Sequence, residues 1–262
     1  MSEKPTPICC SRSTRLCVLV GVLAAVLLAT GYFIWRHHEN EQHRIAPPEL
    51  PSTATLDPEI EARPGVSELR KIGGRIEVDT AISAKPITKV FLTSTGATDA
   101  DVEWVKGWSA TRVLDVSGTK ISDAGLRSLQ DLTELQTLQL SFTNLKGVGL
   151  PSLAKLTQLE RLDLSKTQLT DASLAHLKEL RSLKALALID VPISDGGLQH
   201  LASLTNLRRL DLTGTQITDA GLVHLEKLTK LEYLILYGTY VTKAGTEPLS
   251  KKLSGVKMIT PD

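Results

Sequence analysis

Three histidines recur at intervals of 24 residues: His176, His200 and His224. Imidazole is a common metal ligand, so this spacing could indicate a metal site. If each histidine stands on its own helix, however, packed helices are about 8 to 10 Å apart, and three rings cannot all approach one ion to about 2.1 Å. Duplication of a unit also copies residues without selecting them. We therefore predict no metal site, and interpret the other histidines as polar residues beside a hydrophobic segment: His37, His38 and His43.

Three aspartates recur at twice that interval: Asp115, Asp163 and Asp211. If successive units contribute neighbouring strands, these carboxylates lie two strands apart, or about 10 Å. That separation is too wide for a carboxylate pair that shares one small catalytic site. The sequence also contains no P-loop, HExxH, GxSxG or dinucleotide fingerprint. It predicts a protein that is not an enzyme and needs no cofactor.

Charged side chains alternate with leucines in these units. Arg161 and Asp163 occupy the second and fourth places of one unit, and Arg209 and Asp211 occupy the same places two units later. Alternate residues of a strand share a face, so all four would project from one surface of a sheet. Two interpretations stay open: a solvated face with local Arg–Asp pairs, or a polar surface that recognises a partner.

Tyrosines gather near the C-terminus, where three of the four fall within eight residues: Tyr233, Tyr237 and Tyr240. A tyrosine supplies a large contact area with a polar tip and is enriched at binding hot spots. A last repeat also departs from its consensus when it caps an array, so interface and cap are both open. The candidate partner-binding residues are therefore Arg161, Asp163, Arg209, Asp211, Tyr233, Tyr237 and Tyr240.

The overall charge and the cysteines exclude several classes of protein. Thirty basic against 29 acidic side chains leave a net charge of +1, so there is no basic field of the kind that attracts nucleic acid. The three cysteines are Cys9, Cys10 and Cys17, which leaves the rest of the chain without disulfides or thiolate metal sites. Cys9 and Cys10 are either inert thiols or sites of lipidation.

A 24-residue repeat positions these side chains. Taken together its copies read xxLxLxxTxITDAGLxxLxxLxxL. The first half alternates, which predicts a short strand, and the second half has leucines at every third or fourth residue, which predicts a short helix. A Ser or Thr before that helix suits the N-cap, and the following Asp suits its positive end. The seven copies start at Thr88, Arg112, Gln136, Glu160, Lys184, Arg208 and Glu232.

One strand-helix unit cannot bury its own leucines, whereas stacked units share one interior. Strands stand about 4.8 Å apart and helices about 8 to 10 Å. The predicted fold is therefore α/β: a curved solenoid with a parallel sheet on the concave face and helices on the convex face.

This pattern resembles the leucine-rich-repeat family, whose LxxLxLxxN signature is matched here by Leu207, Leu210, Leu212 and Thr215. The resemblance covers about residues 88–256 and implies a right-handed solenoid that binds protein. The TxITDAGLxxL form is similar to ribonuclease-inhibitor-like repeats and to membrane-anchored bacterial proteins. Threonine stands where the family usually has Asn or Cys, and Val191 replaces even that threonine.

An apolar run from Leu16 to Trp35 is long enough to span a bilayer. We expect residues 1–15 to be a cytoplasmic N-terminus, residues 16–35 a signal-anchor helix, residues 36–64 a proline-rich linker, residues 65–87 an N-terminal cap, and residues 88–262 the repeat domain. Cleavage near Gly31 is the alternative and would give a secreted protein. Both alternatives place the repeats outside the cytoplasm.

These features predict a membrane-anchored module that binds a protein or glycan partner through its concave face, without catalysis. The alternative is a structural or self-associating envelope protein that has no specific ligand.

Overall fold

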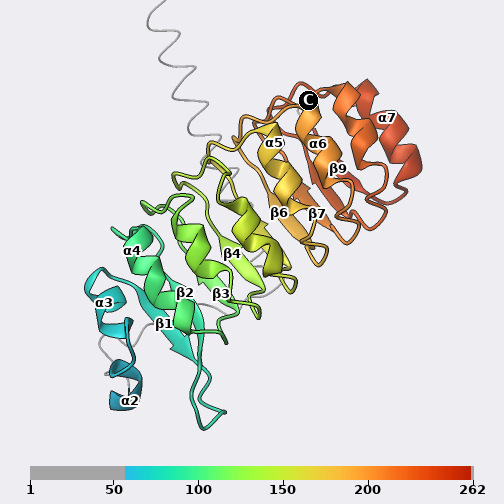
Figure 1. Ribbon diagram of the computed structural model, residues 1–262. Coiled ribbons are helices and arrows are strands. Elements are labelled where there is room, and N and C mark those ends of the chain that lie inside the picture. The colour runs from blue at the N-terminus through green and yellow to red at the C-terminus, as the bar shows by residue number, and fades with distance from the viewer. Residues whose placement is uncertain (1–56, 261–262) are drawn as a thin grey trace, which may run out of the picture. The chain divides into compact units, whose positions relative to one another are not determined.

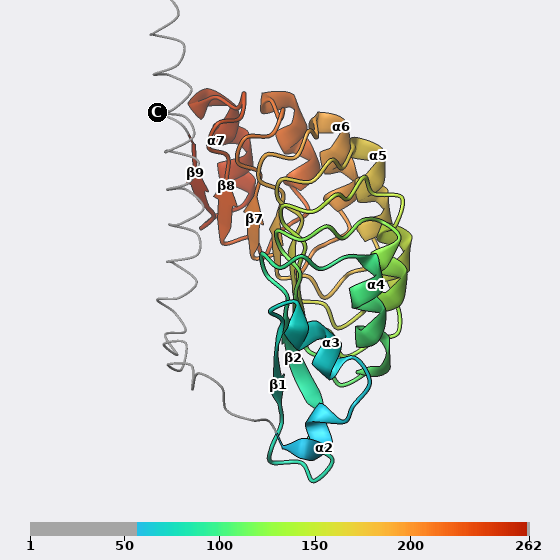
Figure 2. The same ribbon diagram turned by 90° about the vertical axis from the view of Figure 1, so that its left-hand side faces the viewer.

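The computed structural model describes residues 57–260, which form a stack of repeats with one layer of strands and one of helices (Figures 1 and 2). The described strands make a nine-stranded sheet in sequential order. They are β1 (Arg75–Val78), β2 (Ile87–Phe91), β3 (Val113–Asp115), β4 (Thr137–Gln139), β5 (Arg161–Asp163), β6 (Ala185–Ala187), β7 (Arg209–Asp211), β8 (Tyr233–Ile235) and β9 (Lys257–Ile259).

From β2 to β9 every neighbouring pair is parallel and in a register of 24 residues. Leu138 pairs with Leu162, which pairs with Leu186 in the next strand. The predicted side-by-side arrangement of the strands is thus confirmed. Strand β9 extends the ladder by one strand beyond the seven predicted copies. The sequence concealed it because Met258 and Thr260 stand where other repeats have the two alternating leucines.

The helical layer consists mostly of 3₁₀ turns, where ordinary short helices were expected. Leu222, Leu225 and Leu228 are three residues apart, and the 3₁₀ helix has three residues per turn, so this spacing keeps every leucine on the buried side. The elements are α4 (Asp99–Val102), η1 (Glu103–Gly107), η2 (Gly125–Leu129), η3 (Leu150–Lys155), α5 (Asp171–Leu174), η4 (Ala175–Leu177), α6 (Asp195–Leu198), η5 (Gln199–Leu201), η6 (Asp219–Leu225) and α7 (Lys243–Lys252).

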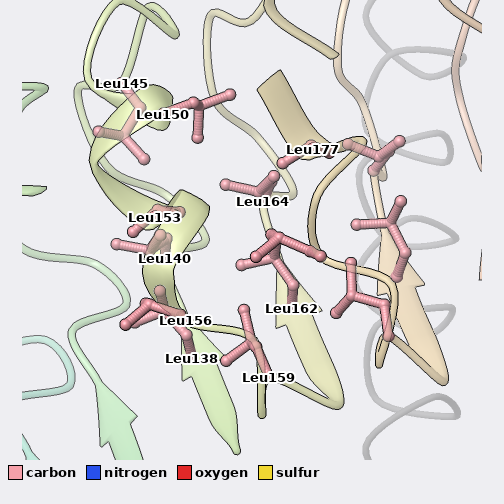
Figure 3. Packing of buried hydrophobic residues seen from close by; sticks show 14 of the residues in the cluster. Leu138, Leu140, Leu145, Leu150, Leu153, Leu156, Leu159, Leu162, Leu164 and Leu177 are labelled. Atoms are coloured by element: carbon pink, nitrogen blue, oxygen red, sulfur yellow. The ribbon is translucent and has the colours of Figure 1, made fainter. Parts of the chain in front are cut away.

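The core is a continuous file of leucines between the two layers. Figure 3 shows Leu138 of β4 beside Leu156, and Leu140, the residue after β4, beside Leu153 of η3; all four have no exposed surface. Burial of one such side chain stabilises the fold by about 1.5 to 3 kcal/mol. Because each repeat contributes leucines to the space shared with its neighbours, the array is stable only as a stack.

The threonine that follows most strands supports the turn of its own repeat. The hydroxyl of Thr143 donates to the carbonyl of Leu140, and Thr167 and Thr215 make the same bond to the third residue before them, at 2.6 Å in each case. Threonine therefore replaces the usual Asn or Cys by capping a local carbonyl.

The aspartate that follows the Ser or Thr before each helix does more than the predicted charge effect on its own helix. Asp123 accepts from the backbone N–H groups of Lys146, Gly147 and Gly149 in the next repeat. In four other repeats the carboxylate reaches the next repeat and accepts hydrogen bonds from both the backbone N–H and the hydroxyl of its Ser or Thr. We call this row the aspartate ladder. Its pairs, with the N and Oγ distances, are Asp99 with Ser122 (2.7 and 2.6 Å), Asp171 with Ser194 (2.8 and 2.5 Å), Asp195 with Thr218 (2.8 and 2.6 Å) and Asp219 with Thr242 (2.7 and 2.8 Å).

The N-terminal end of the sheet is closed by a different kind of unit. Helix α3 (Val66–Lys71) and β1, which pairs antiparallel with β2, both lie within residues 65–87, where an N-terminal cap was expected. The folded unit also includes part of the expected linker, since α2 (Pro58–Glu61) begins at an Asp57 N-cap and buries Ile60.

The predicted membrane helix from Leu16 to Trp35 and most of the linker lie outside the described residues. Within residues 57–260, no helix is both long and apolar enough to cross a bilayer.

Candidate functional site

The strand layer of the array (Figure 2) is the candidate binding face, because its parallel register aligns corresponding residues of successive strands into rows. The strand register aligns the second place of each repeat into one row. From β5 to β9 this row, which we call the basic row, reads Arg161, Ala185, Arg209, Tyr233 and Lys257.

A tyrosine lies between two cations at the C-terminal end of the basic row. The guanidinium carbon of Arg209 is 5.8 Å from the centre of the Tyr233 ring, and Nζ of Lys257 is 5.4 Å from the same centre. Among the described residues no ion pair engages Arg161, Arg209 or Lys257. The local Arg–Asp pairs expected for a merely solvated face are therefore not formed there, and three cations of this row stay available to a partner.

The predicted site residues Asp163 and Asp211 lie beneath this surface. Only 5% of Asp163 and 3% of Asp211 is exposed. Oδ1 of Asp163 accepts from the Ser165 N–H at 2.9 Å, and Oδ1 of Asp211 accepts from the N–H and the hydroxyl of Thr213 at 3.1 and 2.6 Å. These carboxylates cap the turns that leave the strands, so direct contact with a partner falls to the other candidates.

Burial governs the protonation of both carboxyl groups. Loss of hydration raises the pKa of Asp163 above its ordinary value, although hydrogen bonds from Ser165 oppose the rise. Desolvation likewise raises the pKa of Asp211, against bonds from Thr213 and the charge of Arg209. The charged side chains of the basic row, in contrast, are all cations.

The aromatic and apolar candidates surround the basic row unevenly. Tyr237, 46% exposed, lies two residues beyond β8, and Ile259 of β9 is 47% exposed. Tyr240 is 72% exposed but forms an isolated bridge with Thr218, outside the strands. We define the C-terminal patch as Arg209, Tyr233, Tyr237, Lys257 and Ile259.

The turn after each strand contains a left-handed residue that the sequence reasoning missed. Gly118 and Gly214 occupy this seventh place with φ of 66° and 69°, but the three repeats between them have Phe142, Lys166 and Asp190 with φ of 53° to 56°. Nζ of Lys166 lies 4.8 Å from the Phe142 ring centre and 3.4 Å from Asp190. Each non-glycine residue in this conformation costs about 1 kcal/mol. The only signal in the sequence was that glycine, which occupies the seventh place at Gly118 and Gly214, is absent from that place in the three repeats between them.

A second missed feature is a pocket of about 800 Å³ at the N-terminal end of the array. Its lining includes Trp104, which is exposed, and Trp108, which occupies the place taken by a core leucine in later repeats. The pocket also borders Pro64 and Pro86 of the cap. Two of the three tryptophans of an aromatic-poor chain fall within five residues, and that signal could have drawn attention to it.

The three aligned histidines lie in successive 3₁₀ turns: His176 in η4, His200 in η5 and His224 in η6. In the part of the chain that the structure describes, no group of three or more His, Cys, Asp or Glu side chains is arranged to hold a metal ion.

Comparison with known proteins agrees with this architecture. A family model described as "Leucine Rich repeat" matches residues 112–129 and 203–225. No curated protein matches the chain.

Solved structures share its fold. An internalin (inlF) from Listeria monocytogenes is 24% identical, with a TM-score of 0.52 over 60% of this chain and 43% of that one. An internalin C2 from the same organism is 21% identical, with a TM-score of 0.54 over 67% and 81%. The structure of PEPR1-AtPEP1 is 17% identical, with a TM-score of 0.50 over 70% and 25%. The chain spans less than half the length of the first of these.

Together the sheet, the repeat register and these matches define a leucine-rich-repeat fold. At such identities the solved structures establish the fold alone, and the ribonuclease-inhibitor-like repeat type stays a prediction from the sequence.

Proposed function

We propose that this protein is a non-catalytic interaction module that binds a protein partner through the C-terminal part of its strand face. The single observation that carries the proposal is the C-terminal patch, where the Tyr233 ring lies between two cations that have no carboxylate partner among the described residues. Tyrosine and arginine are enriched among the residues that dominate binding energy.

The setting of the patch supports the same function. The curved sheets of repeat proteins provide extended binding surfaces, and the patch spans three adjacent strands, β7 to β9. Exposed Tyr237 and Ile259 add apolar area beside the charges, as is typical of an interface with an apolar centre and a polar rim.

The proposal includes the location of the module. The apolar run from Leu16 to Trp35 would anchor the chain with its N-terminus inside the cell. The proline-rich segment after it would hold the repeats away from the outer face of that membrane. Secretion after cleavage near Gly31 is the alternative. Protease accessibility of the repeats in intact cells, followed by carbonate extraction, distinguishes the two.

The decisive test replaces Arg209→Ala together with Tyr237→Ala in the full-length protein. Partners would be captured by cross-linking in intact cells and compared with wild type. We expect loss of the captured partner with an unchanged melting temperature, because Tyr237 is exposed and neither side chain belongs to the leucine core. Lys178→Ala with Lys227→Ala, on the helix side, serves as the control. An equal loss from the control pair contradicts the proposal.

Self-association is a second candidate function, favoured by the end of the sheet. Among the described residues, β9 pairs only with β8, so its other edge offers free backbone groups. Edge-to-edge pairing of two copies would give a dimer whose mass depends on concentration. Light scattering of wild type and Ile259→Pro would test it, because proline removes a backbone donor.

A further inference from the structure

The spacing of the cations in the basic row restricts the backbone conformation and the charge pattern of the partner, an inference that rests on the proposed function. Arg161, Arg209 and Lys257 stand on β5, β7 and β9, which are alternate strands in one register. Neighbouring strands are about 4.8 Å apart, so the backbone positions of these cations repeat at about 9.6 Å across the sheet.

A partner segment that crosses the strands must present acidic groups at this interval and on one face. A polyproline II helix has three residues per turn and rises about 3.1 Å per residue, so every third side chain faces the same way at about 9.3 Å. In a β-strand the third residue points to the opposite face. In an α-helix the same-face residue whose distance is nearest to the interval between the cations is the seventh along the chain, at about 10.5 Å.

The side chains between the cations favour the polyproline II segment. Tyr233 lies between Arg209 and Lys257, while Ala185, the corresponding residue between Arg161 and Arg209, is small. The row therefore alternates cation, small residue, cation, aromatic ring and cation. Polyproline II ligands bind to surfaces lined by aromatic rings and lose little entropy, because the helix is already extended.

We propose that the basic row binds an acidic, proline-rich polypeptide segment in the polyproline II conformation, with an acidic residue at every third position. Its carboxylates pair with Arg161, Arg209 and Lys257, and its prolines pack on Tyr233 and Tyr237. The buried Asp163 and Asp211 accept bonds from their own turns, which leaves the three cations for the incoming carboxylates.

The test measures fluorescence polarisation of a labelled (Glu-Pro-Pro)₃ peptide with the folded, full-length protein at low and high salt. The matched peptide Glu-Pro-Glu-Pro-Glu-Pro-Pro-Pro-Pro has the same composition with the acids at every second position. We expect tighter binding of the first peptide and weakening with salt. Equal binding of both peptides, no binding of either, or tighter binding of an α-helical peptide with glutamates seven residues apart overturns the proposal.

Substitutions in the protein locate the effect. The triple variant Arg161→Gln, Arg209→Gln, Lys257→Gln should weaken binding of (Glu-Pro-Pro)₃ about tenfold, the fold-change that three exposed ion pairs of usual strength amount to. The control Lys178→Gln, Lys227→Gln, Lys251→Gln removes the same charge from the helix side and should leave Kd unchanged. Equal weakening in both variants means that net charge alone attracts the peptide, and this also overturns the proposal. If the triple variant loses its fold by circular dichroism, the double variant Arg161→Gln, Lys257→Gln replaces it.

The partner-capture experiment distinguishes a failure of this inference from a failure of the proposed function. If Arg209→Ala with Tyr237→Ala abolishes capture while (Glu-Pro-Pro)₃ does not bind, the interaction module stands and the acidic polyproline II segment is wrong. If the peptide binds as expected while capture survives that double substitution, the peptide specificity stands and the proposed function fails.

Discussion

Aspartates recur on both sides of this array, at a 24-residue interval on the helix side and a 48-residue interval on the strand side, and the two rows act differently. On the helix side Asp195 bonds to Thr218 of the next repeat, so the carboxylate ties two units together. On the strand side Asp163 bonds to Ser165 within its own turn and is almost fully buried. The same residue type thus supports assembly between repeats on one side of the array and local turn geometry on the other.

The helix-side row of aspartates is interrupted at one repeat, where a different side chain takes over the role of the carboxylate. The repeat that begins at Gln136 has Gly147 where its neighbours have the ladder aspartate. Thr170 of the following repeat bonds instead to Ser173 of its own turn, and the Ser173 hydroxyl donates to the carbonyl of Lys146 at 3.3 Å. A serine hydroxyl therefore substitutes for the missing carboxylate at this junction.

The largest expected effect on stability comes from adding a side chain at Gly147, where the row of aspartates is interrupted. Gly147 has φ of 100°, and a Cβ there would lie 2.2 Å from Oγ of Ser173. Gly147→Ala should lower the free energy of unfolding by about 3 kcal/mol, from left-handed strain and the displaced hydroxyl together. Urea unfolding would measure it. Gly96→Ala, where a Cβ meets nothing within 4 Å, should change stability little, and a loss of similar size at both sites would contradict the comparison.

The next largest effect is expected when one aspartate of the aspartate ladder is removed. Asp195→Ala deprives the Thr218 N–H and hydroxyl of their acceptor, which should cost about 2 kcal/mol, since bonds to a charged group are worth more than neutral ones. Thermal and urea unfolding would report the loss. Thr218→Ala removes one of the two bonds to Asp195 together with the bond that its hydroxyl accepts from the Ala220 N–H, and it should cost a similar amount. If both single variants and the double variant lose equal amounts, the two residues act as one unit across the repeat boundary.

The smallest effect concerns the strand-side row and depends on pH. Because burial raises the folded pKa of Asp163, its contribution to stability is full below the unfolded pKa, near 3.9, and is lost as pH rises through the folded pKa. Asp163→Asn keeps an acceptor for Ser165 without the charge. We expect the variant to be at least as stable as wild type at pH 7, and its stability to vary less between pH 4 and pH 7. A clear loss at pH 7 would show that the charged form is needed.

The sequence predicted the array well because leucine spacing is a direct record of burial. Leu138 and Leu162 lie side by side as expected, and an error of one residue would have turned every leucine outward. The 3₁₀ character of the helical layer was less visible, because three-residue spacing is compatible with both kinds of helix.

The candidate site was predicted only in part. Alternation correctly put Arg209 and Tyr233 on the strand face, but it assigned Asp163 to the same exposed surface. Alternation gives the face of a residue and not its depth, and the turn after β5 covers that carboxylate with bonds that no periodicity encodes. The Trp108 pocket was missed because it forms between the cap and the first repeat, where the 24-residue pattern does not apply.

The aspartate ladder has a direction, since each of its carboxylates accepts from the repeat that follows it and each of its Ser or Thr hydroxyls donates to the repeat before it. The seventh repeat has Lys243 at the ladder position. Removal of the final repeat would leave Asp219 without its two donors, whereas duplication of residues 184–207 would supply both an acceptor and a donor at the new junction. The array can therefore be lengthened from within by whole units more readily than it can be shortened from its C-terminal end.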